Sequence, residues 1–270
     1  MIDPDAIERC RSFIGRTRDA MDSMAPETAA QLSVILEAQP PEMLPLCWHW
    51  AYFNAAIPQQ NVGHDGHEAL GIFLPDVPLP RRMWAGGDID VLAPLVFGAP
   101  ATRQTTIEDV SFKQGSTGDL CFVTLRHDIS QERLAIRERQ TIVYRHPGQP
   151  EAALRKSNDP IPTGYRTVPD TTLVAYSAIT QNGHRIHWDR DFCRNIENYP
   201  DLVVHGPLLA TFLATELVPK PAPCRFRYRA IAPVFETSPF QVVKDGNVAR
   251  IVRSDGVVAM SAEVLTGSDD

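Results

Sequence analysis

The stretch Tyr176–Cys193, YSAITQNGHRIHWDRDFC, and the stretch Tyr199–Leu217 that follows it, YPDLVVHGPLLATFLATEL, are the part of the sequence that decides the fold. Within 24 positions this segment places six polar residues able to carry chemistry: Asn182, His184, His187, Asp189, Asp191 and His205. Apolar runs flank the group. Polar side chains gathered between apolar runs are typical of a partly buried functional site, so we expect one here.

Two side chains of this group suit acid–base chemistry. His187 is a candidate general acid or base, because an unperturbed imidazole has a pKa of about 6.5 and changes charge near neutral pH. Asn182, five positions earlier, can orient a water molecule or a carbonyl. It cannot accept a proton as a carboxylate does.

A zinc site is the alternative for the same histidines. His184 and His187 are three positions apart, with Asp189 and His205 nearby. Imidazoles at this spacing on one face of a helix can share a metal ion. Gly183 and its polar neighbours favour a loop over a helix here, so we expect no metal.

A helix is predicted from Pro207 to about Leu217, and Gly206 stands directly before it. The N-terminus of a helix carries partial positive charge and unpaired N–H groups that suit an oxyanion. Pro207 has no N–H, so the donor is the amide of Gly206 or one beyond Pro207. Such an amide could stabilise a thioester carbonyl that becomes enolate-like while water adds to a conjugated double bond.

The two halves of the chain repeat one plan, a helix-containing segment followed by strands. The first half has helical patterns at Asp5–Phe13 and Pro26–Ala38, and strand-like stretches at Ala101–Lys113, Gly118–Asp128 and Leu134–Tyr144. The second half has strand-like stretches at Cys224–Ile231, Pro239–Lys244, Ala249–Arg253 and Val257–Leu265. Helices in blocks and strands in runs indicate an α+β fold. We expect a helix wrapped by a curled antiparallel sheet, occurring twice.

Three features of the central segment together resemble the hydratase motif of the MaoC-like, (R)-specific enoyl-CoA hydratase family. They are the spacing Asn182–His187, the element His187-Trp188-Asp189 and the pair His205-Gly206. In that family an Asp precedes the His by five positions, and here Asn182 stands in its place. The resemblance implies that His187 is the base or acid, that Asn182 positions the water and that the Gly206 N–H polarises the thioester.

Three segments resemble one branch of this family more narrowly: Thr180–Asp191 (TQNGHRIHWDRD), Pro78–Gly87 (PLPRRMWAGG) and Phe112–Val123 (FKQGSTGDLCFV). The branch holds mesaconyl-CoA and itaconyl-CoA hydratases and the type 2 3-hydroxyacyl-thioester dehydratases, with a FAS1-like dehydratase domain. Asn is usual in this branch at the position of Asn182. The resemblance extends from roughly Leu74 to the C-terminus.

The resemblance implies an α+β double hot-dog fold. Residues 1–150 are then a non-catalytic N-terminal hot-dog domain that lends substrate-tunnel walls, 151–170 a linker, and 171–270 the catalytic hot-dog domain. The implied activity is that of a hydro-lyase that adds water reversibly to an α,β-unsaturated acyl-CoA. A C5 dicarboxylyl-CoA, mesaconyl-CoA or itaconyl-CoA, is the expected substrate. The alternatives are a general 3-hydroxyacyl-thioester dehydratase of fatty-acid metabolism, a hot-dog thioesterase and an acyl-thioester binding protein.

Substrate contacts are expected from six further residues: His184, Arg185, His205, Arg81, Arg82 and Trp84. Arginine pairs bidentately with phosphate and carboxylate oxygens, so the three arginines are candidates for the coenzyme A phosphates or the distal carboxylate. The alternatives are a solvated turn at Arg81–Trp84 and a surface salt bridge from Arg185 to Asp189 or Asp191. The Gly- and His-rich stretch Asn61–Gly71, with its two histidines, is expected to be a surface loop.

Composition excludes several other classes of protein. The net charge of −7 and the absence of a basic face argue against a nucleic-acid partner. The acidic N-terminus lacks the build of a signal peptide, and the apolar runs fall short of a bilayer span of about 20 residues. Five scattered cysteines without a CxxC pair suggest reduced thiols in a cytoplasmic protein. No cofactor is expected beyond the coenzyme A of the substrate, and a homodimer is the assembly we consider.

Overall fold

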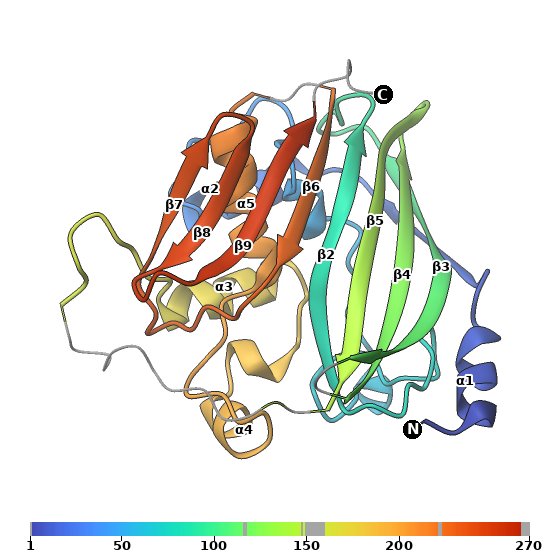
Figure 1. Cartoon of the computed structure of the whole chain (residues 1–270). Helices are drawn as coiled ribbons and strands as arrows, with labels where there is room; N and C mark the ends of the chain where they lie inside the picture. The colour runs from blue at the N-terminus through green and yellow to red at the C-terminus, as the bar shows by residue number, and fades with distance from the viewer. Residues whose placement is uncertain (1, 116–117, 147, 149–159, 221–222, 266–270) are drawn as a thin grey trace.

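The computed structural model describes residues 2–115, 118–146, 148, 160–220 and 223–265. Within these residues, nine strands form one sheet in the order β1-β3-β4-β5-β2-β6-β9-β8-β7, with antiparallel neighbours throughout. Figure 1 shows β2 and β6 side by side in the middle of this sheet, where the two halves of the chain meet.

The elements of the first half are α1 (Pro4–Arg11), β1 (Thr17–Asp22), α2 (Pro26–Ile35), the 3-10 helices η1 (Trp48–Ala51) and η2 (Gln59–Asn61), β2 (Arg81–Val91), β3 (Ala101–Gly115), β4 (Gly118–Ser130) and β5 (Leu134–Arg145). Those of the second half are α3 (Asp170–Ile179), η3 (Arg185–His187), α4 (Arg190–Asn195), α5 (Gly206–Leu217), β6 (Cys224–Ala230), β7 (Phe240–Asp245), β8 (Val248–Arg253) and β9 (Val258–Leu265). The predicted helices and strands are confirmed with small shifts of their ends. The sequence did not indicate β1, β2 or α4.

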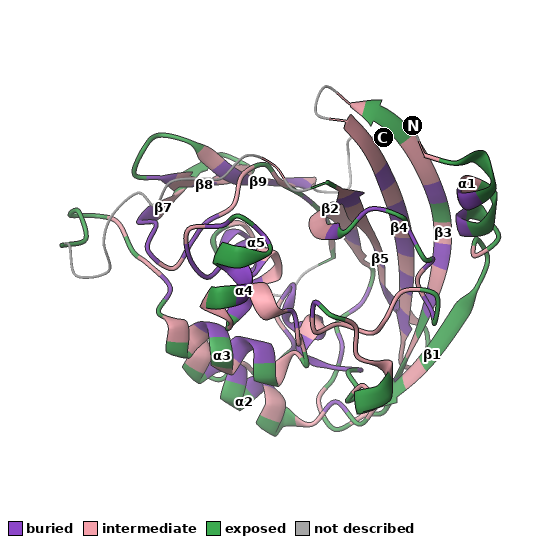
Figure 2. Ribbon diagram, turned by 90° about the horizontal axis from the view of Figure 1, so that it is seen from below, coloured by how far each residue is buried: buried purple, intermediate pink, exposed green. Residues whose placement is uncertain are grey.

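Helix α5 lies at the centre of the molecule. Its residues Leu208–Ala214 are all buried, and it contacts β8 and β9 most closely. Figure 2 shows α5, α3 and α2 on the concave side of the curved sheet. A second apolar cluster lies under the strands of the first half and includes Ile107, Val123 and Tyr144. The fold is thus α+β, and each half contributes strands to one continuous, curled antiparallel sheet.

The first half differs from the expected plan in the position of its helix. Helix α2 packs against α3 and η1, so it does not repeat the placement of α5 along a sheet. The aromatic segment around η1 packs into the main core instead, through the buried side chains of Trp48 and Tyr52. This arrangement brings η1 next to the strands that join the two halves.

Strand β2 rules out one alternative considered for Arg81–Trp84, a solvated turn. It pairs with β5 from Arg81 to Val91 and with β6 from Gly86 to Val91. Arginine and glycine are not typical strand formers, which explains why the pattern was missed. Gly87 is required here, because a Cβ would collide with the backbone carbonyl oxygen of Arg139 and lie 2.5 Å from the Tyr228 hydroxyl oxygen.

The predicted division into residues 1–150, 151–170 and 171–270 stays a prediction. Residues 151–159 of the predicted linker lie outside the described residues. In the part that is described, Arg166 exchanges two backbone hydrogen bonds with Phe240, at 2.8 and 2.9 Å. The sheet itself runs without a break from one half to the other through β2 and β6.

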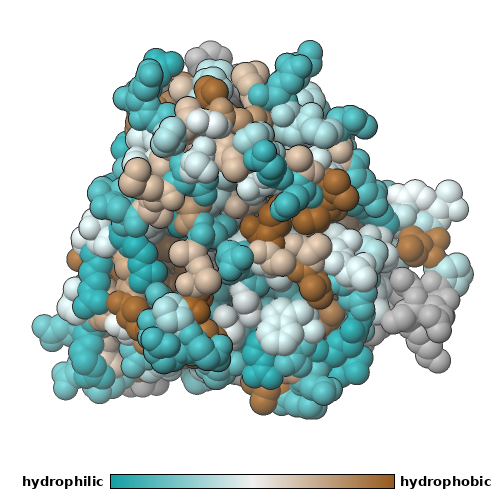
Figure 3. Space-filling model, turned by 180° about the vertical axis from the view of Figure 1, so that it is seen from behind, coloured by the Kyte–Doolittle hydropathy of each residue, from teal (hydrophilic) through white to brown (hydrophobic). Residues whose placement is uncertain are grey.

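Polar and apolar side chains are interspersed on the helical side of the molecule (Figure 3). Among the helices that the structure describes, none has the length and hydropathy to cross a membrane.

Candidate active site

Four imidazoles form a row between the two halves of the chain. The ring centroids are 4.7 Å apart from His67 to His184, 5.6 Å from His184 to His187, and 3.6 Å from His187 to His205. His67 comes from the loop after η2, whereas the others come from the segment that begins after α3. The row corrects the expectation that the loop Asn61–Gly71 carries only surface histidines.

His187 is held in one orientation by the backbone. Its Nδ1 lies 2.7 Å from the carbonyl oxygen of Val203, and a carbonyl can only accept. We therefore assign the proton to Nδ1, which leaves the lone pair on Nε2. Burial lowers the pKa of His187 to about 4, so the ring is neutral at neutral pH. A neutral imidazole with a fixed tautomer is suited to act as a general base.

His205 lies behind His187 and is fully buried, with 0% of its surface exposed. Its Nε2 is 2.8 Å from the hydroxyl oxygen of Ser177, and burial holds its pKa well below the usual range. Its Nδ1 has no hydrogen-bond partner among the described residues. Because the His205 ring has no exposed surface, we favour a role in supporting His187 over the predicted contact with substrate.

Asn182 shapes the loop that carries His184. Its Oδ1 accepts a hydrogen bond from the backbone N–H of His184 at 3.1 Å, while its own N–H donates to Ser177. Gln181, just before it, has a positive φ of 50°, which ends α3 in a tight turn. Among the described residues the amide Nδ2 has no partner and could donate to a water molecule or a carbonyl, so the predicted role of Asn182 stays a prediction.

Gly206 begins α5 and touches β2. A Cβ at this position would lie 2.5 Å from Cε3 of Trp84, so glycine is needed for the two segments to approach. The start of α5 supplies the partial positive charge that the sequence predicts for an oxyanion site. The structure therefore brings Gly206, His187 and Trp84 into one region.

The loop of the first half docks directly on the segment that carries His184 and His187. Gly66 and Gly183 touch through their backbones, and a Cβ on either glycine would collide with the carbonyl of the other. The N–H of Arg185 donates to the carbonyl oxygen of Asp65 at 2.8 Å. These contacts place His67 beside His184.

Asp65 and Arg82 form a bidentate ion pair beneath this loop, with N–O distances of 2.6 and 2.9 Å. Burial alone would raise the pKa of Asp65, but the Arg82 guanidinium holds it well below the usual range. Burial and the same guanidinium lower the pKa of His67 to about 3. Asp65 was not expected to be buried, and its pairing with β2 fixes the loop that carries His67.

The arginines predicted to contact substrate all have carboxylate partners within the chain. Arg81 is 4% exposed and pairs with Glu197 at 2.5 Å. Arg185 pairs with Asp189 at 2.7 Å and lies over the ring of Phe192. These pairs favour structural roles for the arginines. The pairing of Arg185 with Asp189 is the salt bridge considered as the alternative to substrate binding. Substrate binding by these side chains stays a prediction.

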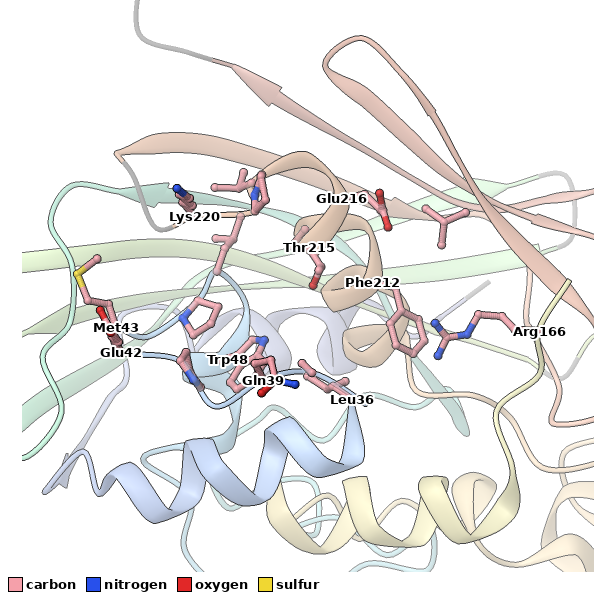
Figure 4. Close-up of a pocket in the computed structure, with 18 residues that line it drawn as sticks. Leu36, Gln39, Glu42, Met43, Trp48, Arg166, Phe212, Thr215, Glu216 and Lys220 are labelled. Carbon is pink, nitrogen blue, oxygen red and sulfur yellow. The ribbon is translucent and has the colours of Figure 1, made fainter. Parts of the chain in front are cut away.

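A cavity of about 580 Å³ lies at the other end of α5. Figure 4 shows Phe212 and Arg166 at one side of it and Lys220 at the other. Phe212 and Lys220 belong to the C-terminal end of α5 and the residues after it. The helix has 12 residues and is about 18 Å long at 1.5 Å per residue, so Phe212 lies about 9 Å along it from Gly206.

Among the residues that the structure describes, no group of three or more His, Cys, Asp or Glu side chains is placed to hold a metal ion.

Comparisons with known proteins show the family of the chain. The family model of hydroxyacyl-thioester dehydratase type 2 matches residues 47–236. The chain is 40% identical to mesaconyl-C(4)-CoA hydratase of Chloroflexus aurantiacus, over 95% of this chain and 97% of that protein. It is 28% identical to the mitochondrial hydroxyacyl-thioester dehydratase type 2 of Schizosaccharomyces pombe, over 72% and 75% of the two chains.

Solved structures show the same fold. HtdX of Mycobacterium tuberculosis superposes with a TM-score of 0.65 at 16% identity, over 92% of this chain and 99% of that one. A conserved hypothetical protein of the same organism, described as a double hot-dog fold, gives a TM-score of 0.54 at 14% identity, over 93% and 95%. The chain therefore belongs to the hydroxyacyl-thioester dehydratase type 2 family of MaoC-like, double hot-dog hydratases and dehydratases.

Proposed function

We propose that the chain hydrates an α,β-unsaturated acyl-CoA and that His187 and Gly206 carry the reaction. The observation that supports this most is the fixed, neutral His187, whose Nδ1 is committed to Val203 and whose Nε2 is free to take a proton. The start of α5 lies in the same region through Trp84 and supplies an amide at Gly206. A base and an oxyanion donor are the two groups that conjugate addition of water needs.

In the proposed reaction, His187 Nε2 removes a proton from water while the water oxygen bonds to the β-carbon of the substrate. The electrons of the double bond move to the thioester oxygen, which the Gly206 N–H stabilises as an enolate. The enolate then takes a proton at the α-carbon, and the protonated His187 is the source that returns the ring to neutrality. Asn182 would hold the water through its amide. Dehydration of a 3-hydroxyacyl thioester is the same path in reverse.

The proposed substrate is a C5 dicarboxylyl-CoA such as mesaconyl-CoA. Support comes from the relative named mesaconyl-C(4)-CoA hydratase, which is 40% identical over nearly the whole of both chains. A distal carboxylate in this site needs a donor or a cation, because an unpaired buried charge costs several kcal/mol. A general 3-hydroxyacyl-thioester dehydratase is the second candidate, supported by the family model and by the relative from Schizosaccharomyces pombe.

The test follows the ultraviolet absorbance of the conjugated thioester with purified protein, while a thiol reagent monitors free coenzyme A. Loss of absorbance without thiol release is expected for crotonyl-CoA and mesaconyl-CoA. Thiol release would indicate a thioesterase, and no change with any enoyl-CoA would support a binding protein. His187→Ala is the matched control for contaminating hydratase. An acyl-CoA thioester is the partner that this proposal requires, and a homodimer stays a prediction.

A further inference from the structure

Three aromatic side chains, Trp50, Trp84 and Tyr228, form what we call the aromatic wall. The Trp84 ring is stacked on Tyr228, with centroids 4.5 Å apart and planes inclined by 14°. Trp50 meets both rings edge-on, at 5.6 Å from Trp84 and 5.9 Å from Tyr228. The three residues come from η1, β2 and β6, so the wall stands where the two halves of the chain join.

The wall is fixed from behind by the buried carboxylate of Glu138. Trp50 Nε1 donates to both of its oxygens at 3.1 Å, and the Tyr228 hydroxyl donates to Oε1 at 3.0 Å. His49 Nε2 lies 3.0 Å from Oε2. Burial alone would raise the pKa of Glu138, but these partners, His49 foremost, lower it to about 2. Two of the three rings of the wall, Trp50 and Tyr228, are thus hydrogen-bonded to one charged group.

Glycines let the wall approach its neighbours closely. Gly87 leaves room for the Tyr228 hydroxyl, and Gly206 leaves room for the six-membered ring of Trp84. The contact with Gly206 puts the wall directly beside the proposed oxyanion donor. An acyl group whose thioester oxygen binds at Gly206 therefore meets Trp84 within a few bonds.

The space behind the wall is polar and charged. His127 is buried between Thr105 and Gln140, at 2.8 and 3.1 Å, and it is the cross-strand neighbour of Glu138. An apolar acyl chain that extended past the wall would have to break the hydrogen bonds of a buried carboxylate. The free-energy cost rises with each methylene of the acyl chain that passes the wall.

We propose that the aromatic wall ends the acyl site and restricts the enzyme to short acyl groups. This inference rests on the proposed function and goes beyond it by naming what limits the chain length. The wall is not wholly apolar, because Trp84 Nε1 is buried without a hydrogen-bond partner among the described residues. A polar group at the end of a short acyl chain would satisfy that N–H, whereas a methyl group would not.

The experiment compares kcat/KM for crotonyl-, hexenoyl- and octenoyl-CoA in the wild type, Trp84→Ala and Phe212→Ala. A pocket wall discriminates a single methylene by roughly 10- to 200-fold, so the wild type is expected to disfavour octenoyl-CoA strongly. Trp84→Ala opens a space on the order of 150 Å³, enough for a benzene-sized apolar group. It should raise the octenoyl-to-crotonyl ratio at least about tenfold. Because the ratio compares two substrates of the same variant, a general loss of activity caused by a disturbed Gly206 does not change it.

Phe212→Ala is the matched control, because it also empties a buried aromatic position but lines a cavity that none of the three wall residues lines. It should leave the ratio unchanged. Trp84→Leu is the second variant if Trp84→Ala does not fold by circular dichroism, and a smaller change in the same direction is expected. The wall proposal is overturned if the wild type already accepts octenoyl-CoA as well as crotonyl-CoA, or if both alanine variants shift the ratio equally. Failure of the proposed function looks different, because the wild type would then hydrate none of the three substrates.

Discussion

The imidazole rings of His187 and His205 are stacked face to face, with centroids 3.6 Å apart and planes inclined by 20°. Two cations at this separation would repel each other strongly in a buried site, so at most one ring can be protonated at a time. His205 is bonded to Ser177 and has no exposed surface. In the proposed reaction the proton is therefore taken up by His187, while His205 packs against its ring.

His187→Ala is expected to lower kcat by at least about 100-fold, which is the low end of what a positioned acid–base group contributes. The measurement is steady-state hydration of the preferred enoyl-CoA, with circular dichroism to confirm folding. His64→Ala is the matched control, because that side chain is exposed and lies outside the imidazole row. Near-normal turnover by folded His187→Ala would move the base to His184.

Asn182→Asp is expected to retain more activity than Asn182→Ala. The carboxylate of an aspartate can accept the hydrogen bond that Oδ1 now accepts from the His184 N–H, so the loop keeps its shape. Alanine removes that acceptor and also leaves the water unheld. Both variants are compared by kcat and by thermal unfolding. Equal loss of kcat in two folded variants would show that the amide N–H₂ itself is needed.

The parts of the site that lie close together in sequence could be predicted from it. The spacing from Asn182 to His187 is local, and the start of α5 is marked by Gly206 and Pro207. The runs of alternating residues likewise predicted β3, β4 and β5 with nearly correct ends. Each of these features depends on neighbours a few residues away.

The contribution of the first half could not be predicted, because it depends on contacts across the fold. His67 reaches the row only because Gly66 touches Gly183, more than 100 positions later. Arg82 of β2 pairs with Asp65, which lies 17 positions earlier in the loop. The Gly- and His-rich composition was the one feature of the loop that could have drawn attention to it. Composition alone does not predict where a loop lies in the fold.

Stability is expected to fall as the pH is lowered from about 7 to 5. Burial lowers the pKa of five histidines, at positions 67, 127, 184, 187 and 205. In the unfolded chain each has a pKa of about 6.5, so below that pH the unfolded state binds more protons than the folded one. For His187 this loss continues down to its folded pKa of about 4. Each such histidine removes roughly 1.4 kcal/mol of unfolding free energy per pH unit in this window.

The check is urea unfolding at several pH values between 7.5 and 5. His67→Gln should reduce the slope of unfolding free energy against pH by the contribution of one histidine, roughly 1.4 kcal/mol per pH unit. Asp65 and Glu138 have lowered pKa values and act with the same sign, but only below the usual carboxyl range of about 4. A stability that does not change between pH 7 and 5 would contradict the buried, neutral state of the row.

Arg185→Met is expected to lower kcat/KM for mesaconyl-CoA and crotonyl-CoA together, with their ratio unchanged within about threefold. The guanidinium already binds Asp189 and donates to the carbonyl oxygen of His64 at 3.2 Å, so its loss disturbs the docking of the two loops. The measurement is kcat/KM for both substrates in one buffer. A selective loss of mesaconyl-CoA hydration would instead assign the distal carboxylate to Arg185, as the sequence first suggested.

Trp84→Phe is expected to lower kcat/KM for mesaconyl-CoA relative to crotonyl-CoA by about tenfold or more, the value of one hydrogen bond to a charged group. Phenylalanine keeps an aromatic ring against Tyr228 but removes the Nε1–H that has no partner among the described residues. Crotonyl-CoA ends in a methyl group, so its kcat/KM should change little and serves as the internal control. Trp50→Phe tests the neighbouring indole, whose N–H is already bound to Glu138 and so should not alter the ratio. An unchanged ratio in Trp84→Phe would remove the indole N–H from substrate recognition, and a wild type that prefers crotonyl-CoA would favour the general 3-hydroxyacyl-thioester dehydratase.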